Sequence, residues 1–84
     1  MTSISDASIR ATLLRLARER GPEKSFCPSE AARSLSDNWR PLMPDVRRVA
    51  QQLVDAGMLV CTQRGQPAQP LTTRGAIRLR GLAK

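Results

Sequence analysis

The sequence predicts one small, mainly α-helical domain that ends in a short β-hairpin. Three observations support this fold class. Two stretches repeat apolar side chains at the helical period, and another stretch begins with a helix start signal. The last part of the chain is β-prone. A chain of 84 residues can bury one modest core. We therefore expect a single domain over residues 1–84, ordered from about 6 to 80.

The first predicted helix covers Asp6–Arg20. Ile9 and Leu13 fall on one face at helical spacing, which indicates a stripe that packs against a core. The stretch Ser3–Asp6 offers several N-cap side chains, and Gly21-Pro22 ends the helix.

A second, shorter helix is predicted after a brief extended piece at Ser25–Phe26. Its start is the segment Cys27–Glu30, in which Pro28 suits the first helical position and the glutamate charge complements the helix dipole. The polar run Ser36–Asn38 ends it with turn chemistry. Its small apolar side consists of Ala31, Ala32 and Leu35.

The third predicted helix, Leu42–Gly57, has signals at both ends. Pro44 suits the first position of a helix, and Gly57 can adopt the left-handed conformation that closes one. One face is apolar and is expected in the core, with Val46, Val49, Ala50, Leu53, Val54 and Gly57. The opposite face is polar and carries Arg47, Arg48, Gln51 and Gln52.

The rest of the chain predicts a hairpin with a basic outer side. Met58–Gln63 is β-prone, and Arg64-Gly65 supplies a turn. The two prolines of Gln66–Pro70 restrict that return to an edge strand or an irregular loop. In Ala76–Arg80 apolar side chains alternate with arginines, which indicates a strand buried on one side only.

Charge is the clearest compositional signal. The net charge is +7 and the isoelectric point is about 11.3, and no acidic residue follows Asp55. Such a basic balance favours anionic partners such as nucleic acid, or an anionic membrane surface. No apolar run is long enough to span a membrane and the N-terminus lacks the layout of a signal peptide, so we expect no membrane association and a cytoplasmic protein.

The order of these elements is that of a winged helix-turn-helix domain, whose third helix lies in the major groove of double-stranded DNA. We therefore expect a double-stranded DNA-binding module with no catalytic activity, metal or cofactor. The residues expected to face the groove are Arg40, Arg47, Arg48, Gln51 and Gln52. Those expected to hold phosphates are Arg64, Arg74, Arg78 and Arg80.

Several short motifs carry a closer resemblance. They are Cys27-Pro28-Ser29-Glu30, Trp39-Arg40, Leu42-Met43-Pro44-Asp45-Val46-Arg47, Thr62-Gln63 with Gly65, and Gly75-Ala76-Ile77-Arg78-Leu79. Together they resemble the pattern of the bacterial domain-of-unknown-function family 3253, whose usual Gly-Pro-Ile-Arg is here Gly75-Ala76-Ile77-Arg78. The resemblance implies a winged-helix-like fold and leaves function open, because that family has no established biochemical role.

Protein–protein interaction or dimerisation is the alternative class of function, because one fold can serve either purpose. Asp45 and Asp55 favour this alternative, since they flank the polar face of the third predicted helix. A carboxylate near a phosphate is repelled unless it accepts a hydrogen bond from cytosine.

An enzyme is the weakest alternative, because the sequence has no histidine and no glycine-rich phosphate loop. Cys27, just before a helix, is the one arguable nucleophile, and we favour a structural role for it. Cys27 and Cys61 are expected as reduced thiols, with a disulfide left open. Trp39 is interpreted as a core anchor in preference to a ligand platform.

Overall fold

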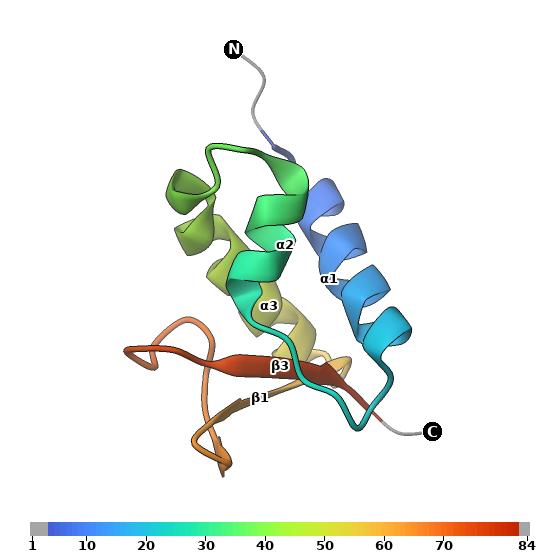
Figure 1. Ribbon diagram of the computed structural model, residues 1–84. Coiled ribbons are helices and arrows are strands. Elements are labelled where there is room, and N and C mark those ends of the chain that lie inside the picture. The colour runs from blue at the N-terminus through green and yellow to red at the C-terminus, as the bar shows by residue number, and fades with distance from the viewer. Residues whose placement is uncertain (1–3, 83–84) are drawn as a thin grey trace.

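A computed structural model describes residues 4–82 and shows three helices packed on a small sheet (Figure 1). Residues 1–3 and 83–84 of the predicted domain, Ser3 among them, lie outside the described residues. The elements are α1 (Asp6–Arg20), α2 (Pro28–Leu35), the 3₁₀ turn η1 (Arg40–Leu42), α3 (Met43–Asp55), β1 (Leu59–Gln63), β2 (Gln66–Pro67) and β3 (Arg78–Gly81). The sheet has the order β2-β1-β3 and is antiparallel throughout. The predicted fold class, mainly α with a C-terminal β wing, is confirmed as winged-helix-like.

The helix ends follow from local chemistry, which is why most of them were predictable. The Ser5 hydroxyl accepts a hydrogen bond from the N–H of Ser8 at 3.1 Å and caps α1. In α2 the N–H of Cys27 donates to the Glu30 carboxylate at 2.9 Å. Gly57, with φ of 74°, ends α3 in the left-handed conformation and donates to the carbonyl of Val54 at 3.0 Å.

The core lies where the inner faces of the three helices meet the sheet. Phe26 is the largest fully buried side chain, and burial of a phenylalanine contributes about 2–3 kcal/mol. The predicted inner face of α3 is confirmed for Val46, Val49, Ala50 and Leu53, which are buried. Val54 is only partly buried, and Gly57, which lies past the end of the helix, is exposed. Other buried residues are Ile9, Leu13, Ala31, Ala32, Leu59, Cys61, Ile77 and Leu79.

The sheet is built mainly from β1 and β3, with a single bridge to the segment before α2. Phe26 and Leu79 exchange two backbone hydrogen bonds, of 2.7 and 2.8 Å, as the extended piece predicted at Ser25–Phe26 requires. The predicted return strand at 66–70 shrinks to Gln66–Pro67, because proline lacks the N–H that a longer ladder needs. The strand predicted at 76–80 begins later, at Arg78, and keeps Leu79 on its buried side.

The two cysteines are free thiols. Cys61 lies in β1 and is buried, and this burial raises the pKa of its thiol although the Arg47 charge opposes the rise. Cys27 is partly exposed, and its sulfur accepts a hydrogen bond from the Ser29 hydroxyl at 3.1 Å.

No helix between residues 4 and 82 is long and apolar enough to cross a membrane. That same range holds no group of three or more His, Cys, Asp or Glu side chains suited to a metal ion.

Candidate nucleic-acid interface

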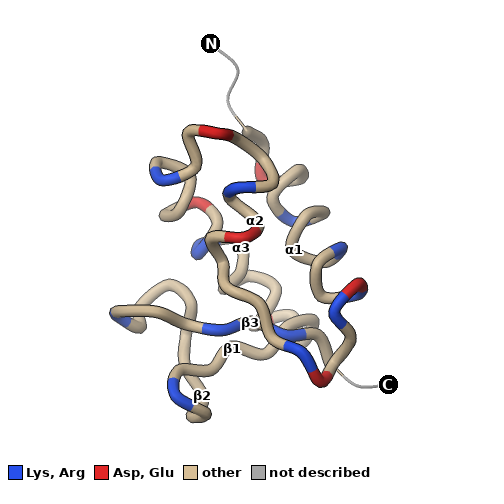
Figure 2. Tube along the Cα trace, viewed as in Figure 1, with Lys and Arg blue, Asp and Glu red and all other residues tan. Residues whose placement is uncertain are grey.

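The segment that joins β1 to β3, residues 64–77, is called the wing from here on. Within it, β2 folds back on β1 and pairs Gln63 with Gln66, so Arg64 and Gly65 form a two-residue turn. Both turn residues have positive φ, 53° for Arg64 and 81° for Gly65, which suits the twist of a β-hairpin. The wing carries basic positions and no acidic one (Figure 2).

Arg47, predicted to face the DNA groove, instead holds the wing against α3. Its Nη1 donates to the carbonyl oxygens of Pro70 at 3.2 Å and Thr73 at 2.9 Å. Its Nη2 donates to the carbonyl oxygen of Gly75 at 2.6 Å. A guanidinium has five N–H donors in a fixed fork, so one side chain can hold three carbonyls of an irregular loop.

Two glutamines complete this attachment. Gln51, another predicted groove residue, donates to Gln69 Oε1 at 2.7 Å and to Asp55 Oδ1 at 2.8 Å. Its own side-chain oxygen accepts from the N–H of Leu71 at 3.3 Å. Gln63 on β1 donates to the carbonyl oxygens of Arg74, at 2.6 Å, and Ala76, at 3.2 Å. The role of Gln63 was missed, because its partners lie on the far side of the wing.

Arg48, also predicted to face the groove, joins α3 to α1. It forms two hydrogen bonds with the Asp6 carboxylate, at 2.8 and 2.7 Å, and a third with Asp45 at 3.3 Å. The hydrogen bond from Arg48 lowers the pKa of Asp6, and the two carboxylates raise the pKa of Arg48. The charge of Arg48 is therefore balanced within the domain.

Arg78 and Arg80 lie against the connection between α1 and α2. Arg78 donates to the hydroxyl of Ser25 at 3.0 Å and to its carbonyl oxygen at 2.9 Å. Arg80 reaches the carbonyl oxygens of Pro22 and Gly81 only at 3.5 Å, so its contacts are weak. These two predicted phosphate ligands are thus placed on β3 and outside the wing.

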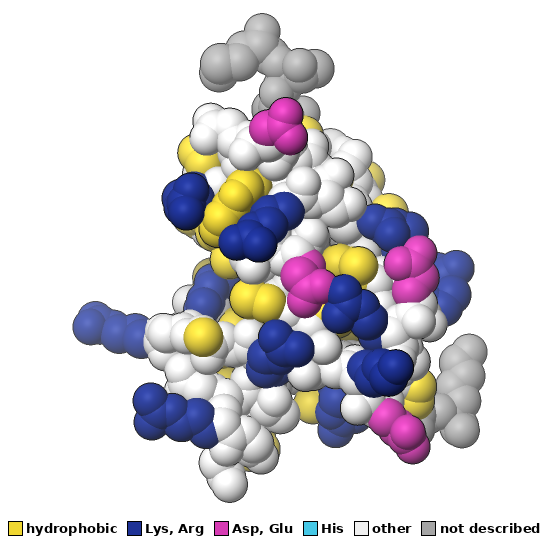
Figure 3. Space-filling view, viewed as in Figure 1, with side chains coloured by type: hydrophobic (Ala, Val, Ile, Leu, Met, Phe, Trp, Pro, Cys, Tyr) yellow, Lys and Arg dark blue, Asp and Glu magenta, His cyan; other side chains and the backbone are white. Residues whose placement is uncertain are grey.

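Four of the predicted residues keep their polar groups available. Arg40, Gln52, Arg64 and Arg74 are exposed. Their side chains make no hydrogen bond or ion pair with any part of the chain that the structure describes. Gln52 lies on α3, Arg40 lies in η1 just before it, and the other two lie in the wing. Dark-blue side chains project from the wing end of the molecule in the space-filling view (Figure 3).

The turn between α2 and α3 contains a cluster that sequence reasoning did not identify. The guanidinium carbons of Arg33 and Arg40 lie 4.6 and 4.7 Å from the centre of the Trp39 ring. Trp39 is partly buried and packs against the core, as the anchor interpretation requires. The indole also forms cation–π contacts with both guanidiniums. The spacing of Arg33 and Trp39 in the sequence did not indicate this contact.

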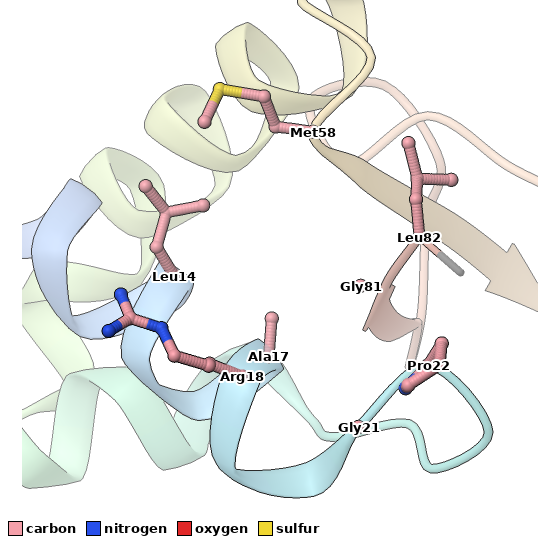
Figure 4. A pocket seen from close by; sticks show the side chains of 8 residues that line it. All are labelled: Leu14, Ala17, Arg18, Gly21, Pro22, Met58, Gly81 and Leu82. Atoms are coloured by element: carbon pink, nitrogen blue, oxygen red, sulfur yellow. The ribbon is translucent and has the colours of Figure 1, made fainter. Parts of the chain in front are cut away.

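A separate hollow lies between α1 and the end of the sheet where β1 begins and β3 ends (Figure 4). Its volume is about 530 Å³, and it is lined chiefly by apolar side chains. Met58 and Leu82, which are 38% and 47% exposed, contribute to its wall together with Leu14 of α1. Arg18 lies at its edge, and Arg10 contacts the sulfur of Met58 at 3.7 Å. This hollow is called the α1 groove below.

The three helices and three-stranded sheet define a mainly α, winged-helix-like domain. Residues 6–81 match the family described as protein of unknown function DUF3253, and the chain belongs to that family. The resemblance carried by its motifs is therefore confirmed. No curated protein matches the chain.

Proposed function

We propose that this protein is a winged helix-turn-helix module that binds double-stranded DNA through α3, the turn before it and the wing. The proposal rests on a difference between two sets of polar side chains around α3. One set is hydrogen-bonded within the domain, and the other is exposed and makes no such bond. Arg47 and Gln51 fix the wing beside α3, whereas Arg40, Arg64 and Arg74 have no hydrogen-bond or ion-pair partner within residues 4–82. Unpaired arginines beside a fixed helix are suited to phosphates on either side of a DNA groove.

The proposal divides the predicted residues into two roles. Gln52 is exposed on α3 and would contact base edges, while Arg40, Arg64 and Arg74 would hold phosphates. Arg47, Arg48 and Gln51 are positioning residues, because their polar groups are engaged within the domain. The proposal assigns no catalytic activity and no cofactor to the chain.

The carboxylates on α3 are less of an obstacle to DNA than their number suggests. Asp45 accepts a hydrogen bond from Arg48, and Asp55 accepts one from Gln51. A paired carboxylate repels a phosphate less than an isolated one does, because a nearby donor offsets its charge. The acid-free wing carries the adjacent positive charge.

The test is a titration of fluorescently labelled duplex DNA with the full chain, followed by polarisation at about 50 and 200 mM salt. We expect micromolar or tighter binding at the lower salt, with a loss of about tenfold or more at the higher salt. A single strand of the same length, used as the control, should bind more weakly. Absence of salt-dependent duplex binding up to about 100 µM protein would refute the proposal.

The α1 groove supports a second candidate function, which is docking of a partner protein. Arg10, Leu14 and Arg18 follow one another at intervals of four along α1, so an apolar side chain lies between two cations. We propose an occupant that is an apolar segment with flanking carboxylates from another protein. A second copy of this chain is disfavoured, because two-fold pairing of this surface opposes like charges.

This second candidate is tested with an amphipathic peptide of leucines and glutamates, added to isotopically labelled protein in an NMR titration. We expect shifts at Leu14 and Met58, loss of the Leu14 shift in Met58→Glu, and no shifts from a matched peptide with lysines in place of glutamates. Equal binding of both peptides, or no binding of either, would contradict the proposed occupant. A stable homodimer by light scattering that Met58→Glu dissociates would also contradict it.

A further inference from the structure

The cluster at the turn between α2 and α3 combines features of an anion site. Arg33 comes from the last turns of α2 and Arg40 from η1, and both guanidiniums contact the ring of Trp39. Both arginine side chains are exposed, and neither donates a hydrogen bond to any group between residues 4 and 82. Each of the two cations thus lies over the ring of the same tryptophan and has exposed N–H donors.

The cluster holds two like charges with no carboxylate between them. Asp37 belongs to the same turn, but it forms no ion pair with either arginine in the described part of the chain. The electron-rich face of the indole attracts each cation and offsets part of their mutual repulsion. Anionic oxygens that accept hydrogen bonds from these guanidiniums would offset more of the repulsion, so the cluster favours a ligand with several charged oxygens.

A phosphate group is the anion that fits this arrangement. Its oxygens match the fork of N–H donors on a guanidinium. The Trp39 ring is partly buried and already carries the two cations, so stacking on a nucleic-acid base is disfavoured. The chemistry recognised is therefore the phosphate and not the base.

We propose that Arg33, Trp39 and Arg40 form a phosphate-binding site that receives a backbone phosphate of duplex DNA beside the start of α3. The choice of DNA as the source of the phosphate rests on the proposed function, whereas the anion site itself does not. The site precedes α3 in the chain, and the unpaired arginines of the wing follow it. Trp39 acts as a positioning residue that orients both guanidiniums.

Trp39 is the only tryptophan of the chain, so its emission reports on this site without any label. The full chain is titrated with unlabelled duplex DNA and, separately, with inorganic phosphate, while binding of labelled duplex is followed by polarisation. We expect the Trp39 emission to change along the same binding curve as the polarisation. Arg33→Ala should weaken duplex binding by about three- to tenfold and lower the salt slope by about 1.

Arg18→Ala is the matched control. It removes the same charge from an exposed α-helical arginine that has no hydrogen-bond partner in the described range, but at the α1 groove. We expect it to leave affinity within about twofold, because it lies away from the proposed interface. Circular dichroism of both variants verifies that each is folded.

The outcomes separate this inference from the proposed function. Duplex binding in which Arg33→Ala equals Arg18→Ala, or in which Trp39 emission stays constant, would refute the phosphate site and leave DNA binding standing. A response of Trp39 to inorganic phosphate that Arg33→Ala removes, without any duplex binding, would support the site and refute DNA as its ligand. No response to either probe would refute both.

Discussion

Arg47 and Arg48 on α3 and Arg64 and Arg74 on the wing have opposite surroundings, although sequence reasoning gave all four a role in DNA binding. The two helical arginines donate to carbonyl or carboxylate oxygens at 2.6–3.3 Å. The two wing arginines are exposed and have no such partner among the described residues.

The difference shows how a small domain supports an irregular loop. The wing contains only the two-residue strand β2, so most of its carbonyls lack a ladder partner. Arg47 and Gln63 supply the missing donors from outside the wing, and Gln51 accepts a hydrogen bond from the N–H of Leu71. Long polar side chains on α3 thus contribute to the shape of the proposed interface, and the wing contributes the available charge.

The largest expected effect is on stability, from replacement of Arg47. Arg47→Ala removes the donors to three wing carbonyls, and we expect the free energy of unfolding to fall by about 2 kcal/mol. Arg47→Lys keeps the charge but lacks the fork, so it should lose most of the same amount. Urea denaturation measures both. If Arg47→Lys were as stable as the wild type, charge and not the three-way attachment would be the contribution of Arg47.

The opposite result is expected for the wing. The double variant Arg64→Ala with Arg74→Ala should keep its unfolding free energy within about 0.5 kcal/mol, because both side chains are exposed and unpaired within the described chain. Its duplex affinity should fall by about tenfold, with a salt slope lowered by about 2. Polarisation at several salt concentrations measures this. A destabilised variant would show that the wing arginines contribute to folding, and unchanged duplex affinity would show that they do not bind DNA. Either result would contradict the proposed difference between the arginines of α3 and those of the wing.

Neighbouring glutamines allow a smaller test of the same contrast on α3 itself. Gln51→Ala should destabilise the protein by about 1 kcal/mol, because Gln51 bonds to the wing. Gln52→Ala should be nearly neutral for stability and should alter the preference among duplex sequences. Denaturation and competition binding with a set of duplexes separate the two. The opposite assignment of effects would show that the wrong glutamine faces the DNA.

The smallest effect concerns pH. Arg48 lowers the pKa of Asp6 below its ordinary value of 3.8, so folding favours the charged carboxylate. The resulting stabilisation is present above pH 3.8 and is lost as the pH falls through the lower pKa of the folded protein. Asp6→Asn should therefore lose a small part of the stability near neutral pH and show a flatter decline in acid. An unchanged pH profile of this variant would mean that Arg48 is not held by Asp6.

The elements were predictable because their signals are local. Ser5, Pro28 and Gly57 act within a few residues of their own position, and each has the cap or turn role that its chemistry predicts. The short length of β2 also agrees with the prediction that the two prolines of Gln66–Pro70 restrict strand formation there.

The roles of the arginines were not predictable, because they depend on partners far along the chain. Arg48 meets Asp6 from a distance of 42 residues, and Arg47 meets Gly75 from a distance of 28. A helical pattern identifies which face is polar, but it does not identify what that face touches. Arg33 was missed for the same reason, since only the folded turn brings it to Trp39.

The bridge between Phe26 and Leu79 has a consequence for how the protein folds. These two residues are far apart in the sequence, and they pair through backbone hydrogen bonds. Phe26 is fully buried in the folded domain, where it pairs with β3. The residues of the three helices therefore leave the ribosome before β3 is available to close the core. Formation of the native state waits for Leu79, so synthesis of the last strand sets the earliest moment of stable folding.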